Sequence, residues 1–251
     1  MDRKIYEHAD TAGLAGMLEA DAGSEGYRFG IIATDGAFSM EGNLAPLADL
    51  CRVTTQYERL LFVDDSHGVG VAGPSGRGSP EALGVHGQID VLSGTLGKAL
   101  GGAAGRYIAG SRALVEFLRQ KARPYMFSNS LPPRIVSASL EALRILEDAT
   151  TQVDKLSDNT RYFRKQIQAL GFTILEGSHP IVPVMLGPAA LAMDMGAALL
   201  EHGVYIKGLW YPVVPQGKAR LRAQISAALD RRDLDRALDA FERVGKKSGV
   251  I

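Results

Sequence analysis

Residues 93–102 read Ser-Gly-Thr-Leu-Gly-Lys-Ala-Leu-Gly-Gly, and the fold of the chain is decided by this stretch. The run at 89–92 leads into it and predicts a short buried strand. The strand is followed by Lys98, which is set among glycines that keep bulky side chains away from its ε-amine. A lysine that is partly withdrawn from water loses basicity, because burial disfavours its charged form. A neutral amine is the form that reacts with a carbonyl carbon to give an imine.

Two glycine-rich patterns resemble nucleotide-binding motifs but lack features that those motifs need. A P-loop requires Ser or Thr directly after its lysine, and here Ala99 follows Lys98. Residues 68–73 match G-x-G-x-x-G, a dinucleotide motif in which a helix begins at the third glycine. Residues 74–80 are rich in Pro, Gly and Ser and predict a loop instead. We therefore exclude both nucleotide-binding interpretations.

Length and composition exclude several classes of protein. The chain has 251 residues, enough for a buried core and two lobes, and it carries 28 basic and 28 acidic residues. With no net charge, it has no field that would attract nucleic acid or an anionic membrane. Its single cysteine, Cys51, excludes a disulfide framework, and the histidines lack metal-ligand spacing. The polar residues 1–10 predict no signal peptide, and the apolar region 188–200 is too short to span a bilayer, so we expect a cytoplasmic protein.

The order of the predicted elements indicates an α/β fold. Short apolar runs at 31–34, 60–63 and 89–92 predict strands, a helical pattern lies at 44–57, and residues 107–109 could form a fourth strand. Strands that alternate with helices imply a mainly parallel sheet that is covered on both faces.

The pattern changes in the C-terminal part, where shorter strands and helices predict a smaller α+β lobe. Residues 125–133 predict a loop, and the strands expected beyond it lie at 172–175, 181–186, 204–206 and 221–225. We expect a large domain over residues 1–140 and a small C-terminal domain over residues 141–251.

Polar side chains follow three of the predicted strands. They are Ser39 after the first, Asp64 with His67 after the second, and Thr95 with Lys98 after the third. Ligands of parallel sheets bind at the carboxyl ends of the strands. A lysine for an imine, a carboxylate to keep a ring nitrogen protonated and an imidazole suit pyridoxal phosphate. Each residue alone also has an ordinary interpretation, since Asp caps loops, His fills loops or cores and Thr favours strands.

Several motifs resemble the α-oxoamine synthases, which are fold-type I (aspartate aminotransferase-like) pyridoxal phosphate enzymes that condense an amino acid with an acyl-coenzyme A. They are residues 64–70 (Asp-Asp-Ser-His-Gly-Val-Gly), 76–79 (Gly-Arg-Gly-Ser) and 93–102. Residues 33–42 and 123–131 most resemble the glycine C-acetyltransferase branch of that family. The resemblance implies condensation of glycine with acetyl-coenzyme A to 2-amino-3-oxobutanoate, a reaction of threonine and glycine metabolism. An enzyme similar to the 8-amino-7-oxononanoate synthases, which use alanine and a longer acyl-coenzyme A, is the alternative.

The resemblance implies a role toward pyridoxal phosphate for each residue at the strand ends. Lys98 would hold the cofactor as an imine and later move the α-proton of the substrate. Asp64 would pair with the pyridine nitrogen, and His67 and Ser39 would lie near the phenolic oxygen. Thr95 would bind the phosphate.

The resemblance also implies partners. Ser128 and Asn129 would reach the neighbouring subunit's site, which predicts a homodimer, and Arg222 would bind the substrate carboxylate. Without the resemblance, Arg220 and Arg222 would be ordinary surface charges of a strand. Family members begin with a long segment that has no counterpart before Ile31, so we expect a partial large domain and the C-terminal portion of a synthase. An inactive fragment that dimerises or complements an N-terminal piece is therefore a further alternative.

Overall fold

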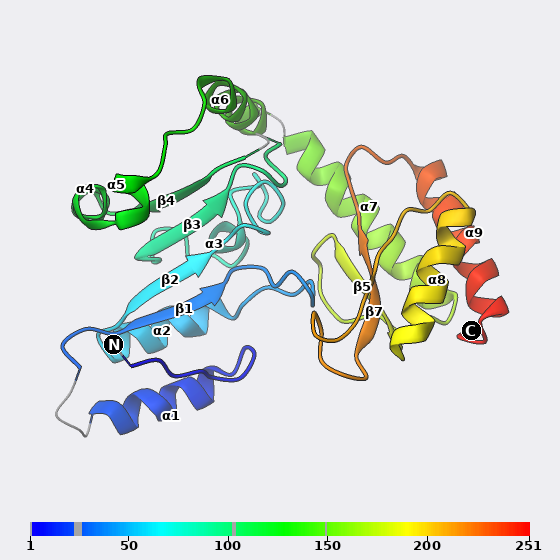
Figure 1. Ribbon diagram of the computed structural model, residues 1–251, viewed down its shortest axis with the longest axis horizontal. Helices are drawn as coiled ribbons and strands as arrows, with labels where there is room; N and C mark the ends of the chain where they lie inside the picture. The colour runs from blue at the N-terminus through cyan, green and yellow to red at the C-terminus, as the bar shows by residue number, and fades with distance from the viewer. Residues whose placement is uncertain (1, 23–26, 102–103, 149) are drawn as a thin grey trace. The chain divides into compact units, whose positions relative to one another are not determined.

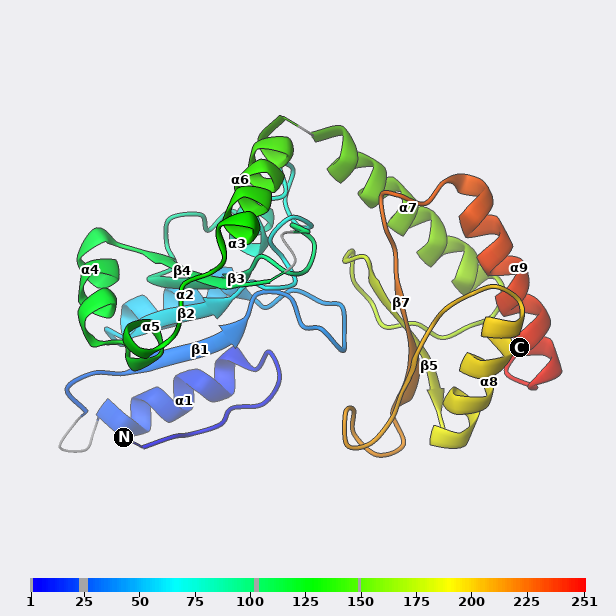
Figure 2. The ribbon, with the colours of Figure 1, turned by 45° about the horizontal axis from the view of Figure 1, so that its top comes forward.

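The computed structural model describes residues 2–22, 27–101, 104–148 and 150–251, and the chain divides into two compact units. Residues 1–37 and 44–149 belong to the first unit, and residues 38–43 and 150–251 belong to the second. Each unit has its own β-sheet (Figures 1 and 2). The mixed α/β fold expected from the sequence is confirmed.

The sheet of the first unit has the strand order β1-β2-β3-β4. Its strands are β1 (Ile31–Asp35), β2 (Leu60–Asp64), β3 (Val91–Thr95) and β4 (Arg106–Gly110). The first three are parallel and β4 is antiparallel to β3, so the prediction of a mainly parallel sheet is confirmed. Asp64 pairs in register with Asp35 on one side and with Ser93 on the other, so the parallel strands end side by side.

Apolar side chains of β2 and of helix α2 (Leu47–Gln56) build the core of this unit. Leu61 and Val63 of β2 are completely buried, as is Leu47 of α2. Helix α1 (Thr11–Ala22) contacts α2, and two of its leucines, Leu14 and Leu18, are buried. Burial of such side chains is the main force that holds the unit together, at roughly 1.5–3 kcal/mol each.

The other helices of the first unit differ in burial. They are α3 (Ser79–Ala82), α4 (Arg112–Lys121), α5 (Arg123–Phe127) and α6 (Pro133–Asp148). Helix α3 has buried residues at Ser79 and Pro80, and the three that follow it are largely exposed. No residue of α4 or α5 is buried, and in α6 only Ser139 is. The prediction of a loop from residue 125 was wrong for the residues of α5, where a proline in the first turn presets a helical backbone angle.

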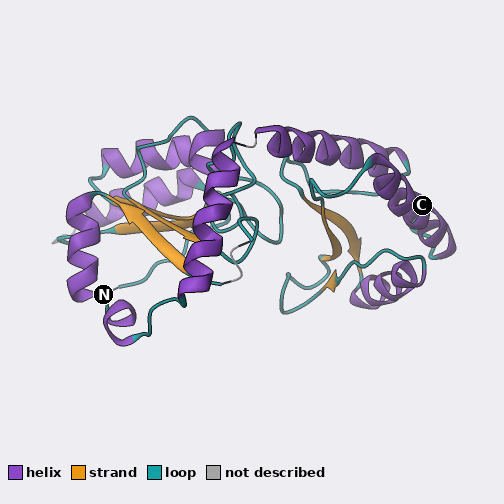
Figure 3. Cartoon of the chain, turned by 90° about the horizontal axis from the view of Figure 1, so that it is seen from above, coloured by secondary structure: helices purple, strands orange, loops and turns teal. Residues whose placement is uncertain are grey.

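The second unit has a three-stranded antiparallel sheet of order β5-β7-β6 with helices packed on it (Figure 3). Its elements are β5 (Ile181–Gly187), β6 (Gly208–Leu209), β7 (Ala219–Gln224), α7 (Thr150–Ala169), α8 (Ala189–Glu201) and α9 (Arg231–Lys247). Helix α8 contacts all three strands, and α9 contacts α7 and α8. The ring of Phe241 packs edge-on against those of Phe163 and Phe172 in the core.

Two of the strands predicted for this unit were wrong. Residues 204–206 are not a strand, and the short strand β6 begins at Gly208. In 172–175, only Ile174 forms an isolated bridge, with Val184. Phe172 is 3% exposed although it is not part of a β-strand. The apolar residues of this stretch are therefore buried in the core without regular strand pairing.

The segment 38–43 belongs to the second unit because two arginines of β7 bind it. Arg220 Nη1 donates to the carbonyl of Met40 at 2.9 Å, and Arg222 Nη1 donates to the carbonyl of Ser39 at 3.0 Å. Gly42 has a φ of +67° and lies against β5, where an added Cβ would come within 2.2 Å of the Ile181 carbonyl oxygen. Only glycine fits this turn.

Candidate active site

The carboxyl ends of β2 and β3 bring a lysine and an imidazole into contact. Lys98 Nζ lies 2.9 Å from Nε2 of His67, a hydrogen-bonding distance. His67 comes from the turn that follows β2, and Lys98 comes from the loop that follows β3. Lys98 is exposed, so burial does not lower its basicity here. A polar atom in contact with its amine is Nε2 of His67.

Asp64, the last residue of β2, has both carboxylate oxygens engaged. Oδ1 accepts the backbone N–H of Ser66 at 3.0 Å, and Oδ2 forms an ion pair with Nη2 of Arg106. The same Nη2 donates to the hydroxyl of Ser66 at 3.0 Å. Partial burial raises the pKa of Asp64, but the hydrogen bonds from Ser66 and the charge of Arg106 outweigh it and leave that pKa below its ordinary value.

The neighbouring carboxylate, Asp65, is completely buried, and it bonds to Ser79 at the start of α3. Its Oδ1 accepts the hydroxyl of Ser79 at 2.6 Å, and its Oδ2 accepts the backbone N–H of Ser79 at 3.0 Å. Burial raises the pKa of Asp65 to about 6, although the bonds from Ser79 act in the opposite direction.

Three glycines leave room for the Asp65 carboxylate. An added Cβ would lie 2.3 Å from it at Gly36, 2.0 Å at Gly68 and 1.8 Å at Gly78. Gly68 and Gly78 belong to two of the motifs that carry the family resemblance. Their absence of a side chain therefore serves the packing of Asp65.

Thr95 ties the two ends of the lysine loop together. Its hydroxyl donates to the carbonyl of Gly105 at 3.1 Å and accepts the N–H of Gly97 at 3.3 Å. These bonds position the loop around Lys98. The predicted phosphate contact of Thr95 stays a prediction.

The remaining predicted residues lie in other parts of the fold. Ser39 and Arg222 are in the second unit, where Arg222 binds the Ser39 carbonyl and burial lowers the pKa of its guanidinium. The side chain of Arg220 is only 4% exposed, so its interpretation as a surface charge was wrong. Ser128 and Asn129 are exposed in the stretch that follows α5.

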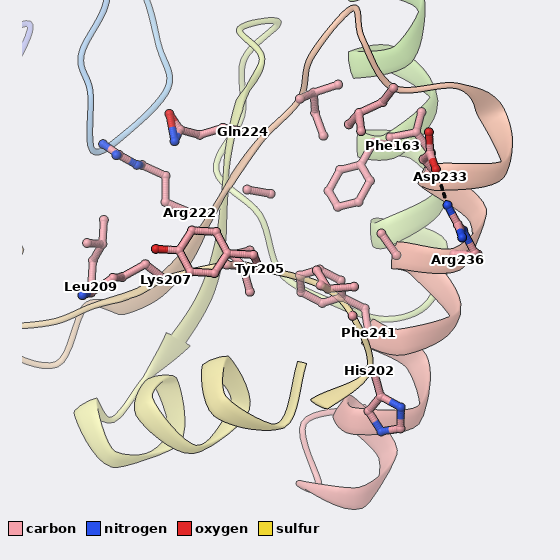
Figure 4. Close-up of a pocket in the computed structure, with 18 residues that line it drawn as sticks. Phe163, His202, Tyr205, Lys207, Leu209, Arg222, Gln224, Asp233, Arg236 and Phe241 are labelled. Atoms are coloured by element: carbon pink, nitrogen blue, oxygen red, sulfur yellow. Dashed lines mark hydrogen bonds and ion pairs between the residues drawn. The ribbon is translucent and has the colours of Figure 1, made fainter. Parts of the chain in front are cut away.

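A hollow of about 790 Å³ lies in the second unit, between β7, α9 and the segment 202–209 (Figure 4). Arg222 and Lys207 contribute cationic side chains to its wall, and Phe163 and Phe241 contribute apolar rings. An acyl chain or an anionic group would suit such a lining, on the ordinary preference of pockets for apolar walls with a few polar groups.

The sequence analysis did not identify Arg106, and it assigned no role to Asp65 or Tyr107. The connection 96–105 is shorter than the dozen or more residues that a parallel crossover needs, and this spacing predicts an antiparallel β4 that begins at the edge where β3 ends. Tyr107 lies over Gly94, where a Cβ would be 2.3 Å from its hydroxyl. Burial, then the charges of Asp65 and Asp64, raise the pKa of Tyr107.

Among the described ranges, no cluster of His, Cys, Asp or Glu is arranged to hold a metal ion. None of the helices described there is long and apolar enough to cross a membrane.

The amino-acid sequence is similar to one protein family and to named enzymes. The family "aminotransferase class I and II" matches residues 4–241. A Bos taurus protein named 2-amino-3-ketobutyrate coenzyme A ligase, mitochondrial, is 48% identical over 98% of this chain and 58% of its own length. An 8-amino-7-oxononanoate synthase of Thermoanaerobacter pseudethanolicus is 42% identical over 100% of this chain and 62% of its own.

Among solved structures, a serine palmitoyltransferase from S. paucimobilis, with a bound PLP–myriocin adduct, superimposes with a TM-score of 0.91 at 32% identity. The match covers 97% of this chain and 61% of that chain. The chain thus spans about 60% of the length of the relatives that it matches.

Proposed function

Because the chain belongs to the aminotransferase class I and II family, we propose that it contributes to a pyridoxal phosphate-dependent acyltransferase. The proposed reaction condenses glycine with acetyl-coenzyme A to give 2-amino-3-oxobutanoate and coenzyme A. The observation that carries the proposal is the contact of Lys98 Nζ with His67 at the carboxyl edge of the sheet, beside Asp64. The 48% identity to the Bos taurus ligase supports the choice of substrates.

The chemistry of these side chains fits pyridoxal phosphate. An exposed amine on a glycine-rich loop is accessible to an aldehyde, and a carboxylate with a lowered pKa keeps the negative charge that a protonated ring nitrogen needs. When bound, the cofactor supplies an electron sink for the carbon that loses a proton.

Proton transfer, binding of the substrate and contacts with the cofactor are assigned to residues of the chain itself. Lys98 would take the α-proton of glycine on Nζ, and His67 orients that nitrogen through the 2.9 Å contact. Arg222 would bind the glycine carboxylate through its guanidinium fork, since its Nη1 alone is used for the Ser39 carbonyl bond described above. Thr95 and Ser39 would contact the phosphate and the phenolic oxygen.

We further propose cofactor binding by the large domain, residues 1–140, next to a small domain, residues 141–251. Ser128 and Asn129 would reach the site of a second copy, which makes a homodimer part of the active enzyme. The exposed apolar side chains of α5 and α6 support such an interface. The proposed location is cytoplasmic, with the mitochondrion as the alternative because of the Bos taurus relative's name.

Two alternatives follow from specific observations. The 42% identity to an 8-amino-7-oxononanoate synthase favours alanine and a longer acyl-coenzyme A as substrates. The coverage of only about 60% of the relatives' length favours a chain that is inactive alone and complements a further segment.

The test is addition of pyridoxal phosphate to the purified chain, followed by borohydride reduction and mass analysis of peptides. We expect a reduced adduct on Lys98 in the wild type and none on that peptide in Lys98→Ala. Absorbance changes with glycine but not with alanine would support the proposed substrates, and the reverse would support the second enzyme. No adduct on Lys98 at millimolar cofactor would refute the proposal for this chain alone.

A further inference from the structure

Arg106 binds Oδ2 of Asp64, the carboxylate oxygen that does not accept the Ser66 backbone N–H. Oδ1 of Asp64 is held by the Ser66 N–H at 3.0 Å, and Oδ2 is held by Nη2 of Arg106. The guanidinium is fixed from a second direction, because Nη2 also donates to the Ser66 hydroxyl at 3.0 Å. The Asp64 carboxylate is thus already paired with a cation of the chain itself.

The sheet explains how Arg106 reaches this carboxylate. Arg106 pairs with Thr95, while Asp64 pairs with Ser93, and alternate residues of a strand point to the same face. Arg106 therefore lies on the face of the sheet that carries Asp64. The two residues are separated by β3, so β2 and β4 are about 10 Å apart. The long arginine stem extends across the strand between them.

This arrangement conflicts with the role proposed for Asp64. A protonated pyridine nitrogen needs a carboxylate oxygen as acceptor, and the guanidinium already uses Oδ2. On the basis of the function proposed above, we propose that Arg106 competes with the ring nitrogen of pyridoxal phosphate for Asp64. Arg106 is then a positioning residue, which keeps the Asp64 carboxylate ionised and in place and weakens the binding of the cofactor.

Exposure sets the size of the effect. The side chains of Arg106 and Asp64 are 57% and 27% exposed, so the pair is screened by solvent. Exposed ion pairs shift an equilibrium by about 1.4- to 5-fold. Removal of Arg106 should therefore tighten cofactor binding about two- to fivefold, and salt should reduce the difference.

A double-mutant cycle tests the competition. The four chains are the wild type, Arg106→Met, Asp64→Asn and the double variant, each titrated with pyridoxal phosphate and quantified by borohydride trapping on Lys98. Methionine keeps the length of the stem but has neither charge nor donors. We expect tighter binding in Arg106→Met and no further change when the same substitution is made in Asp64→Asn. Arg112→Ala, which removes an exposed arginine of α4, is the control and should bind like the wild type.

Three results would overturn the inference. They are unchanged binding in Arg106→Met, weaker binding in that variant, and an equal gain in the Asp64→Asn background. The last would mean that Arg106 acts on the cofactor through something other than Asp64.

A readout without the cofactor separates this inference from the proposed function. Carbon-13 NMR of labelled aspartate carboxyls follows the titration of Asp64 in the wild type and in Arg106→Met. Loss of the guanidinium should raise the pKa of Asp64, because its charge favours the ionised carboxylate. Absence of any adduct on Lys98 would refute the proposed function, whereas an unchanged Asp64 titration would refute the ion pair on which the competition depends.

Discussion

At Asp65 a carboxylate is completely shielded from water, and both of its oxygens accept hydrogen bonds from a single residue, Ser79. Such a group is stable in the interior when its bonds are satisfied, but its charge is still costly there. The cost of burying the charge is larger than the gain from the hydrogen bonds, so burial raises the pKa of Asp65 to about 6. Asp65 therefore prefers to be protonated in the folded chain at a pH where an unfolded chain has lost the proton.

The titration of Asp65 should make the stability of the chain depend on pH. Between pH 4 and pH 6 the folded state keeps a proton that the unfolded state releases, so the free energy of unfolding falls as pH rises through this window. A shift from 3.8 to about 6 corresponds to about 3 kcal/mol. Asp65→Asn has no such proton to lose, and its amide can donate to the Ser79 hydroxyl while accepting the Ser79 N–H. Relative to the wild type, it should gain about 3 kcal/mol between pH 4 and pH 7 in urea denaturation.

Ser79→Ala serves as the matched variant for this measurement. It removes the hydroxyl that stabilises the charged carboxylate, so its loss of stability with rising pH should be steeper than that of the wild type. Parallel stability curves for all three chains would contradict the titration of Asp65.

Sequence reasoning could locate some of these residues and not others. Asp64 and Lys98 follow directly from the rule that side chains of functional sites gather at the carboxyl ends of parallel strands. Asp64 was selected and Asp65 was given no role, although alternation along a strand sends adjacent side chains to opposite faces and predicts a different environment for Asp65. The partner of Asp64, Arg106, depends on the reversal of direction at β4, which the short 96–105 connection predicts but which the sequence analysis did not use.

At the scale of one element, helix α9 begins with a reciprocal cap. The Asp230 side chain accepts the N–H of Asp233, and the Asp233 side chain accepts the N–H of Asp230, each at 3.0 Å. Asp230→Ala should cost about 1 kcal/mol and speed hydrogen exchange at the first turn of α9. Ser111→Ala, at the start of α4, is the control, because α4 buries no residue and its loss should leave the second unit unchanged. Equal exchange of α9 in both variants would contradict the importance of the cap.

The attachment of residues 38–43 is a second property of an element. Arg220 is almost fully buried and binds the Met40 carbonyl and the Glu41 carboxylate. Arg220→Met should accelerate amide exchange across 38–43 at least severalfold, since an unpaired buried acceptor costs about 1–3 kcal/mol. Arg161→Met, in the exposed part of α7, should leave this segment unaffected. Protection of 38–43 that is the same in both variants would assign the attachment to other contacts.

Elements with a regular pattern of apolar residues could be predicted. Elements whose conformation depends on contacts with residues far away in the sequence could not. Helix α2 and the strands β1, β2, β5 and β7 follow from local patterns of apolar residues, whereas the short helix α5 was predicted as a loop. Residues 204–206 have strand-forming side chains but no pairing partner, so the pattern alone misassigned them. The segment 38–43 follows β1 in the chain, yet its binding residues lie some 180 positions away. No local signal in the sequence reports such a contact.

At the scale of the whole molecule, composition predicts a folded chain with no net charge, but it does not predict which part of the surface is apolar. Exposed apolar side chains gather along α5 and α6, where Tyr125, Phe127 and Leu140 are 64%, 77% and 63% exposed. Several large apolar side chains exposed along neighbouring segments are a feature of interaction surfaces. The amphipathic pattern of α6 indicates one apolar face, but only the structure shows that apolar residues of this helix are left exposed by the rest of the first unit.

Self-association through this surface is therefore expected, and it should depend on α6. Leu140→Glu replaces an exposed leucine of α6 by a charge and should weaken the association constant about tenfold or more, because burial of a leucine contributes roughly 1.5–3 kcal/mol. Light scattering coupled to size-exclusion chromatography over a range of concentrations measures this change. Leu200→Glu is the matched control, since Leu200 is 56% exposed on α8 of the second unit and should have no effect. A monomer at every concentration, or equal weakening by both substitutions, would show that the α5–α6 surface does not mediate contact between copies of the chain.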